Sequence, residues 1–212
     1  MYVPKHFEEH RPEELHRVIR EHPLGILILN SADGLDANHI PFELNEENGQ
    51  AVLLAHVARA NPLWREAKDG DEALVIFRAA NAYISPNWYP SKHQFHKQVP
   101  TWNYQAVHVQ GKINIRDDEK FVRAVVARLT RTNETRSGQE RPWKMTDSSK
   151  DYIDQMINAV VGIEIKIEKI VGKWKLSQNK EGLDRSTAAS ELQKRGDTLI
   201  SSAMLATLKP SA

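Results

Sequence analysis

The segment AVHVQGKINIR, residues 106–116, decides the fold of this 212-residue chain. Its odd-numbered apolar residues alternate with polar ones: Val107, Val109, Ile113 and Ile115 against His108, Gln110, Lys112 and Asn114. Alternation with a period of two puts apolar side chains on one face of a strand and polar ones on the other. The segment therefore predicts a β-strand with one face in the core and one in water.

Working outward from it, the sequence predicts a mostly antiparallel sheet. Residues 161–168 alternate in the same way, and shorter apolar runs at 24–29, 35–44, 51–57 and 73–77 have the length of strands. Asp33-Gly34 and Asn48-Gly49 are turn signals that favour hairpins. Together these runs give about six strands.

Helices are expected between and around the strands. Apolar faces with helical spacing occur after Pro12, at 63–68, at 119–130 and at 150–160, and two modest helices are expected after residue 179. The predicted fold is mainly β with α additions: a six-stranded antiparallel barrel with flanking helices. We expect one domain at 1–179 and a helical extension at 180–212 packed on it.

Composition narrows the class of protein. The absence of cysteine excludes disulfides, thiolate metal sites and cysteine nucleophiles. A net charge of +1 argues against a general nucleic-acid coat protein. The sequence begins without an apolar signal segment and contains no apolar run long enough to span a bilayer. We therefore expect a cytoplasmic protein without a membrane partner.

Residues 73–116 contain no Asp or Glu, although the chain has 28 acidic residues. About six would be expected there by composition. The same stretch carries five Lys or Arg residues and a dense run of aromatics between Tyr83 and Tyr104. Such a surface would receive a flat anionic ligand, either a nucleotide-like cofactor or a nucleic acid. The alternative is a basic loop beside a sheet, with the aromatics serving as core.

Short motifs identify a family. They are MYVPKHF (1–7), HIPF (39–42), HVARANP (56–62), YISPNWY (83–89), VPTWNY (99–104) and KWKLSQN (173–179). In these motifs and their order, the chain resembles the PaiB family of negative transcriptional regulators in the FMN-binding split-barrel superfamily. The resemblance implies a homodimeric split barrel that holds flavin mononucleotide (FMN) near the dimer interface. The alternatives are a flavin-dependent oxidoreductase of the pyridoxamine-phosphate-oxidase-like superfamily and a related haem-binding protein.

The first candidate cofactor-binding group is His56, Arg59 and Asn61, between a predicted strand and a predicted helix. Such a turn points backbone N–H groups outward, and an arginine adds a bidentate partner for phosphate. Without the family context, Asn61 would be a helix cap, Arg59 a solvated charge and His56 structural. Related split barrels hold the FMN phosphate with basic side chains at a similar turn, which implies that role for Arg59.

The second candidate group is Thr101, Trp102, Asn103 and Tyr104, which precede the strand that carries His108. Their amide and hydroxyl groups could bond the flavin's pyrimidine edge, and the indole could stack. The third group is Lys175, Ser177, Gln178 and Asn179, whose ammonium and neutral polar groups suit a phosphate or ribityl chain. Core aromatics and an ordinary exposed turn are the alternatives.

Two further functions have weaker support in the sequence. His93 and His96 have the spacing of one helical turn, but the nearby sequence offers no third ligand, so we expect no metal site. Residues 128–144 carry an excess of three positive charges and could contact DNA phosphates, although no helix-turn-helix motif is evident. The alternatives are a solvated loop and DNA binding through a partner.

Overall fold

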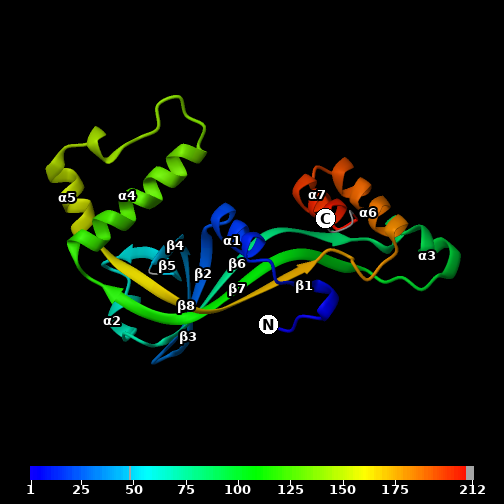
Figure 1. Cartoon of the computed structure of the whole chain (residues 1–212), viewed down its shortest axis with the longest axis horizontal. Helices are drawn as coiled ribbons and strands as arrows, with labels where there is room; N and C mark the ends of the chain where they lie inside the picture. The colour runs from blue at the N-terminus through cyan, green and yellow to red at the C-terminus, as the bar shows by residue number, and fades with distance from the viewer. Residues whose placement is uncertain (48, 209–212) are drawn as a thin grey trace. The chain divides into compact units, whose positions relative to one another are not determined.

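The computed structural model describes residues 1–47 and 49–208 (Figure 1). Within those residues the chain forms eight β-strands and seven α-helices. The strands are β1 (Glu8–Glu9), β2 (Leu24–Ser31), β3 (Gly34–Pro41), β4 (Glu43–Glu47), β5 (Gln50–Ala58), β6 (Glu72–Ile84), β7 (Thr101–Arg116) and β8 (Val160–Lys175). The helices are α1 (Pro12–Glu21), α2 (Leu63–Glu66), α3 (Pro90–Phe95), α4 (Glu119–Arg136), α5 (Lys150–Asn158), α6 (Gly182–Lys194) and α7 (Thr198–Ala206).

All the strands belong to one sheet, in the order β3-β2-β6-β7-β8-β5-β4, and β1 pairs with β8. The pairs β2–β3, β2–β6, β4–β5, β5–β8 and β1–β8 are antiparallel. This confirms the predicted class, mainly antiparallel β with added helices. The predicted number of six strands is corrected to eight in the described residues.

Two local differences explain the higher strand number. The single strand predicted at 35–44 is two strands, because the chain exchanges partner β2 for partner β5 on either side of Phe42. The two-residue strand β1 carries no periodic pattern that sequence could show. Of the predicted Asn48-Gly49 turn, Asn48 lies outside the described residues.

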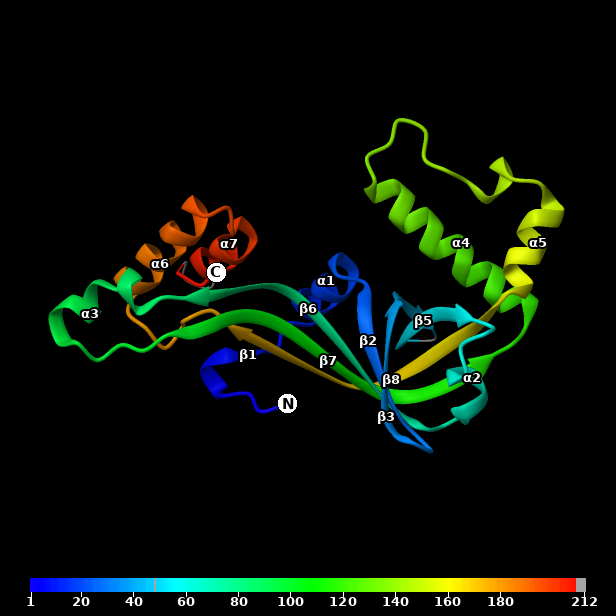
Figure 2. The same ribbon diagram turned by 180° about the vertical axis from the view of Figure 1, so that it is seen from behind.

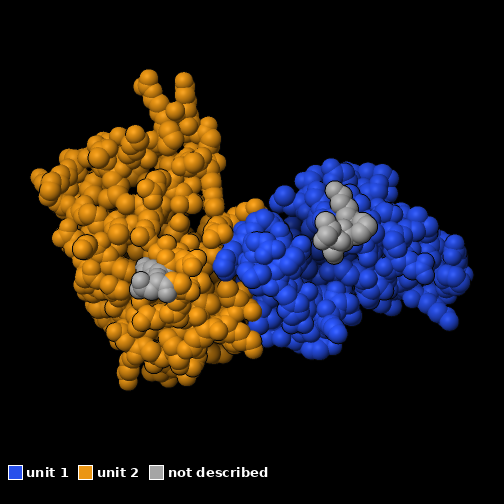
Figure 3. Space-filling view, in the orientation of Figure 1, with its two compact units in different colours: residues 1–18, 78–107, 171–212 blue, residues 19–77, 108–170 orange. Residues whose placement is uncertain are grey.

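The chain divides into two compact units, coloured separately in Figure 3. Unit 1 comprises residues 1–18, 78–107 and 171–212, and unit 2 comprises residues 19–77 and 108–170. Strands β6, β7 and β8 contribute residues to both. Helices α6 and α7 belong to unit 1, and the expected boundary at residue 179 stays a prediction.

Unit 2 owes its core to the alternating strands. Val109, Ile113, Ile163 and Ile165 are fully buried, as the period of two predicts. Helix α4 covers strand β5, where Val125 and Leu129 pack on Val52 and Leu54. Helix α5 follows α4 (Figure 2), and its Ile153 and Ile157 pack on Val122. Both helices begin and carry their apolar faces where the sequence predicts.

Strand β7 requires a glycine where its backbone passes close to that of strand β8. A Cβ built on Gly111 would lie 2.1 Å from the carbonyl oxygen of Lys166, well inside van der Waals contact. The backbones can therefore approach this closely only because residue 111 has no side chain.

Unit 1 joins the two ends of the chain. Glu8 and Glu9 pair with Lys173 and Gly172, and a Cβ on Gly172 would meet the side chain of Leu15 at 2.3 Å. Trp174 and Leu176 are buried in this unit, as are Leu192 and Met204 of its C-terminal helices. In the part of the chain described, no helix combines the length and apolar character needed to cross a bilayer.

Candidate functional site

Unit 1 presents an aromatic–lysine face, which we define as Tyr83, Trp102, Tyr104, Lys173 and Lys175. Trp102 is 55% exposed and Tyr83 is 43% exposed, and their rings meet edge to face at 6.0 Å. The Lys173 ammonium lies 5.4 Å from the centre of the Tyr104 ring. Residues two apart on a strand share a face. Strands β7 and β8 are neighbours, and the contacts of Lys173 with Tyr104 and of Lys175 with Trp102 bring the two pairs together. This face combines aromatic rings with cations.

Lys175 ties the two strands of this face together. Its ammonium donates to the Thr101 hydroxyl and, at 2.6 Å, to the Trp102 carbonyl oxygen. An ammonium has three donors, so one N–H is left for a ligand. Burial, and after it the charge of Lys173, lower the pKa of Lys175. A bound anion would restore the stability of the charged form.

Asn103 and Ser177 lie in the core of unit 1, not on the aromatic–lysine face. Asn103 is 0% exposed and Ser177 is 3% exposed. The Asn103 amide donates to the Ser177 hydroxyl at 2.9 Å and to the Met204 sulfur at 3.3 Å. The Ser177 hydroxyl also lies 3.2 Å from that of Tyr89, which is fully buried. Because their polar groups are already paired, we assign Asn103 and Ser177 a supporting role.

The turn after β8 uses its own side chains. Gln178 accepts from the Leu176 backbone N–H at 2.7 Å and donates to the Trp174 carbonyl at 2.6 Å, which closes the turn on itself. Ser177 holds a positive φ of 65° there, a conformation that residues other than glycine seldom adopt. Asn179 is exposed. Of the third predicted group, Lys175 and Asn179 have side-chain groups open to a ligand.

The predicted phosphate ligand Arg59 belongs to unit 2 and has several partners there. Its guanidinium donates to both carboxylate oxygens of Asp117, at 2.9 and 2.6 Å. It also donates to the carbonyl oxygens of Asn158, at 2.7 Å, and Val160, at 3.2 Å. This bonding lowers the pKa of Asp117. A phosphate at Arg59 would have to share it with a carboxylate, which repels phosphate.

Asn61 and His56 accompany Arg59 in unit 2. The Asn61 side-chain carbonyl accepts from the Leu63 backbone N–H at 2.9 Å, and its amide donates to Asn38 at 2.8 Å. His56 Nδ1 is buried and has no hydrogen-bond partner among the described atoms. Burial lowers the pKa of His56. An unpaired buried nitrogen of this kind could accept a ligand hydrogen bond.

The acid-free stretch at 73–116 spans both units. Its aromatics differ in exposure: Tyr89 is fully buried, whereas Phe95 and Trp102 are exposed. His96 ends helix α3 in the left-handed conformation. Within the described residues, no three His, Cys, Asp or Glu side chains are arranged to hold a metal ion.

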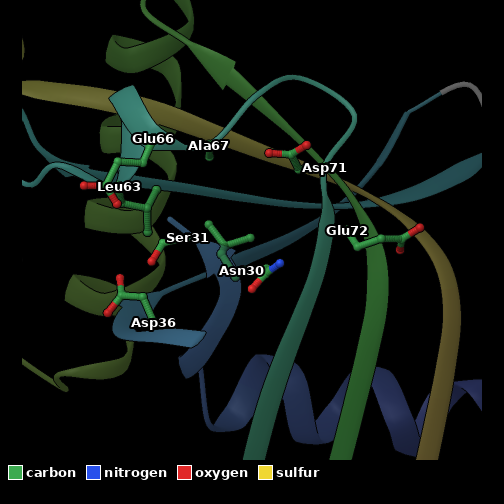
Figure 4. Close-up of a pocket in the computed structure, with 9 residues that line it drawn as sticks. Asn30, Ser31, Asp36, Leu63, Glu66, Ala67, Asp71 and Glu72 are labelled. Atoms are coloured by element: carbon green, nitrogen blue, oxygen red, sulfur yellow. The ribbon is translucent and has the colours of Figure 1, made fainter. Parts of the chain in front are cut away.

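Sequence reasoning did not anticipate an acidic pocket in unit 2, with a volume of about 230 Å³ (Figure 4). Asp36, Glu66, Asp71 and Glu72 line it, from β3, α2, the following loop and the start of β6. Asp36 precedes Glu66, Asp71 and Glu72 by 30 residues or more, so no single local motif announces all four. Four carboxylates would repel a phosphate, and we do not assign the pocket to a phosphorylated ligand.

Comparison with known proteins gives the family. Residues 1–169 match the model of a family described as "Putative FMN-binding domain". The chain belongs to this family. It is 30% identical to the protease synthase and sporulation protein PAI 2 of Bacillus subtilis, over 91% of this chain and 89% of that protein. It is also 36% identical to an uncharacterised protein of Saccharomyces cerevisiae, over 61% of this chain and 88% of that protein. The resemblance predicted from the six motifs is confirmed.

Solved structures confirm the split-barrel fold. The FAD and haem binding protein of Mycobacterium smegmatis superposes with a TM-score of 0.58 at 15% identity, covering 84% of this chain and 78% of that one. The flavocytochrome Anf3 of Azotobacter vinelandii gives a TM-score of 0.55 at 12% identity, covering 82% and 72%. At these identities the comparisons concern the fold alone.

Proposed function

We propose that this protein is an FMN-binding, homodimeric transcriptional regulator of the PaiB type. The proposal that the cofactor is FMN rests on the aromatic–lysine face, which offers exposed rings and an available ammonium N–H in a chain of an FMN-binding family. The regulatory role is supported by the similarity to the sporulation protein PAI 2 over nine-tenths of both chains.

The side chains on this face suit a phosphorylated flavin. Trp102 and Tyr104 would contact the ring system, since planar rings stack on aromatic side chains. Lys175 would bond the phosphate with its remaining N–H, and Lys173 would add a second positive charge. Thr101, Asn103, Ser177 and Gln178 would act by holding Lys175 and its turn in place. Bound FMN supplies a ring that can accept and release electrons.

The cofactor proposal is tested by titrating the protein with FMN and with riboflavin, which lacks the phosphate. Loss of a charge-assisted bond costs about tenfold or more in affinity, so the wild type should prefer FMN by that factor. Lys175→Gln should remove most of the preference. Lys169→Gln is the matched control, because Lys169 is an exposed lysine of the same strand that belongs to unit 2 and not to the five residues of this face. Equal affinity of the wild type for both flavins would show that the protein does not recognise the phosphate.

Arg59 is the rival phosphate ligand, and Asp117 allows the two to be separated. If the phosphate lies at Arg59, Asp117→Asn removes a repelling charge and should raise FMN affinity, while Arg59→Gln abolishes the preference for FMN. If Arg59 only ties Asp117 to the carbonyls of Asn158 and Val160, both substitutions should leave the ratio of the two affinities unchanged. We expect the ratio of the FMN and riboflavin affinities to stay unchanged in both variants.

The regulatory role is tested against the enzymatic alternative with flavin-loaded protein. A regulator should shift a promoter fragment at physiological salt and stay inert to NADH and NADPH. Flavin reduction by either donor, followed by turnover on an acceptor, would instead favour a flavin-dependent oxidoreductase. If residues 128–144 bind DNA phosphates, the Arg136→Ala, Arg141→Ala double variant should flatten the log–log salt dependence by about 0.9 for each phosphate it no longer neutralises.

A further inference from the structure

A cavity of about 390 Å³ lies in unit 2 between helix α4 and the segment that follows it. Its helix side carries Ala127, Arg131 and Glu134, which share one face of α4 because they are four and three residues apart. Trp143, Lys144 and Met145 line the other side. The volume falls within the roughly 300–1,000 Å³ of small-molecule sites.

The structure holds the two sides of the cavity together. The opposite face of α4 is anchored in the core through Val122, Val125 and Leu129. The Trp143 backbone N–H donates to the Glu134 carboxylate at 2.9 Å, which fixes the second wall on the helix. Trp143 stays 41% exposed. An indole in this position offers a planar apolar surface to a ring.

The charges at the cavity indicate the kind of ligand. Arg131 and Lys144 line it with one acid, Glu134, whose carboxylate already accepts from Trp143. Arg131 is exposed, and among the described residues its guanidinium has no hydrogen bond or ion pair. An arginine without a protein partner, next to apolar walls, matches a flat molecule with one carboxylate.

We propose that this cavity binds a small aromatic monoanion, a carboxylate on one or two fused rings, with its ring against Trp143 and its carboxylate on Arg131. The site is separate from the aromatic–lysine face, since all its residues belong to unit 2. It also gives Arg131 and Lys144 a role other than the DNA contact expected for residues 128–144.

The test is calorimetric titration of the whole protein with naphthalene-2-carboxylate and with naphthalene-2-methanol, which has the same rings without the charge. We expect the carboxylate to bind about tenfold more tightly. Arg131→Gln should remove that difference, and Arg131→Lys should retain part of it. Trp143→Ala should weaken both probes. Arg128→Gln is the control, because Arg128 lies on the same helix but does not line the cavity.

Four results would overturn the proposal. Equal affinities for the two probes would show that the cavity does not recognise the carboxylate. An unchanged affinity of Arg131→Gln for the carboxylate would show that Arg131 does not bind it. Absence of binding of the carboxylate up to its solubility limit would show that the cavity is not a site for this class of ligand. Titration in the presence of saturating FMN separates this proposal from the cofactor site: unchanged probe affinity supports a separate cavity, and competitive displacement contradicts it. Circular dichroism of each variant verifies that helix α4 remains folded.

Discussion

Removing the Ser177 hydroxyl should destabilise the protein measurably, because that group is the centre of a buried polar cluster in unit 1. Ser177→Ala deletes the hydrogen bonds at 2.9 and 3.3 Å to the Asn103 side chain and the one at 3.2 Å to the Tyr89 hydroxyl. It leaves a buried amide and a buried phenol with fewer partners. At about 1–3 kcal/mol for each of these two groups, the expected loss in the free energy of unfolding is about 2–6 kcal/mol.

Ser177→Gly separates the hydrogen bonds from the backbone conformation. Glycine loses the same bonds, but it adopts the positive φ of 65° at residue 177 without steric cost. Strain of about 1–2 kcal/mol is relieved, and part of that gain is offset by the greater freedom of glycine in the unfolded chain. The glycine variant should therefore be about 0.5–1 kcal/mol more stable than the alanine variant and still less stable than the wild type.

Urea denaturation of the three proteins, followed by circular dichroism, measures these differences, and FMN titration of the same samples tests the function of the residue. If Ser177 only supports the turn, the affinity of the folded variants for FMN should stay within about threefold of wild type. Alanine as stable as serine would refute the energetic argument. A large loss of FMN affinity with normal stability would instead make Ser177 a direct ligand.

Three further predictions concern other parts of the chain. Burial lowers the pKa of His56, so below about pH 6.5 the unfolded chain binds more protons than the folded one, and the free energy of unfolding falls on acidification. In unfolding curves measured over a pH series, His56→Gln should reduce this loss of stability. The same loss in the variant as in the wild type would contradict the prediction. Gly111→Ala should lower the free energy of unfolding by about 3 kcal/mol or more, because the added Cβ would meet a backbone oxygen. Gly182→Ala should be tolerated, because its added Cβ would have its nearest neighbour at 3.8 Å. Equal melting temperatures of the two variants would exclude the clash at residue 111. Sedimentation at micromolar concentration should show a two-fold dimer, and a monomer that keeps stoichiometric FMN would speak against the proposed assembly.

Periodic segments were predictable because their signal is local. The alternation in 106–116 and the helical spacing at 119–130 reflect burial on one face, and both elements occur. Strand β7 begins earlier than expected, at Thr101, and β6 continues to Ile84, since strand pairing extends these segments beyond their apolar residues. Helix α3 has no buried residue, so no apolar face announces it.

The candidate site was predictable in residue type but not in partners. The aromatics and lysines of the aromatic–lysine face occur in the family motifs, so the sequence could name them. Sequence could not show that Asp117, far along the chain, occupies the Arg59 guanidinium. Nor could it show that Asn103, in a strand, and Ser177, in a turn, point into the core, because a polar residue in either place is expected to face water unless a distant partner satisfies it.

The pairing of Glu8 and Glu9 with Lys173 and Gly172 has a consequence for synthesis on the ribosome. The first segment of unit 1 is made early, but its strand partner emerges only after the whole of unit 2 has been translated. At typical elongation rates the delay is roughly ten to thirty seconds. For that time Phe7 and Leu15, both buried in the finished fold, remain available to chaperones and proteases. A chain that stops at residue 170 would keep this segment permanently without its partner.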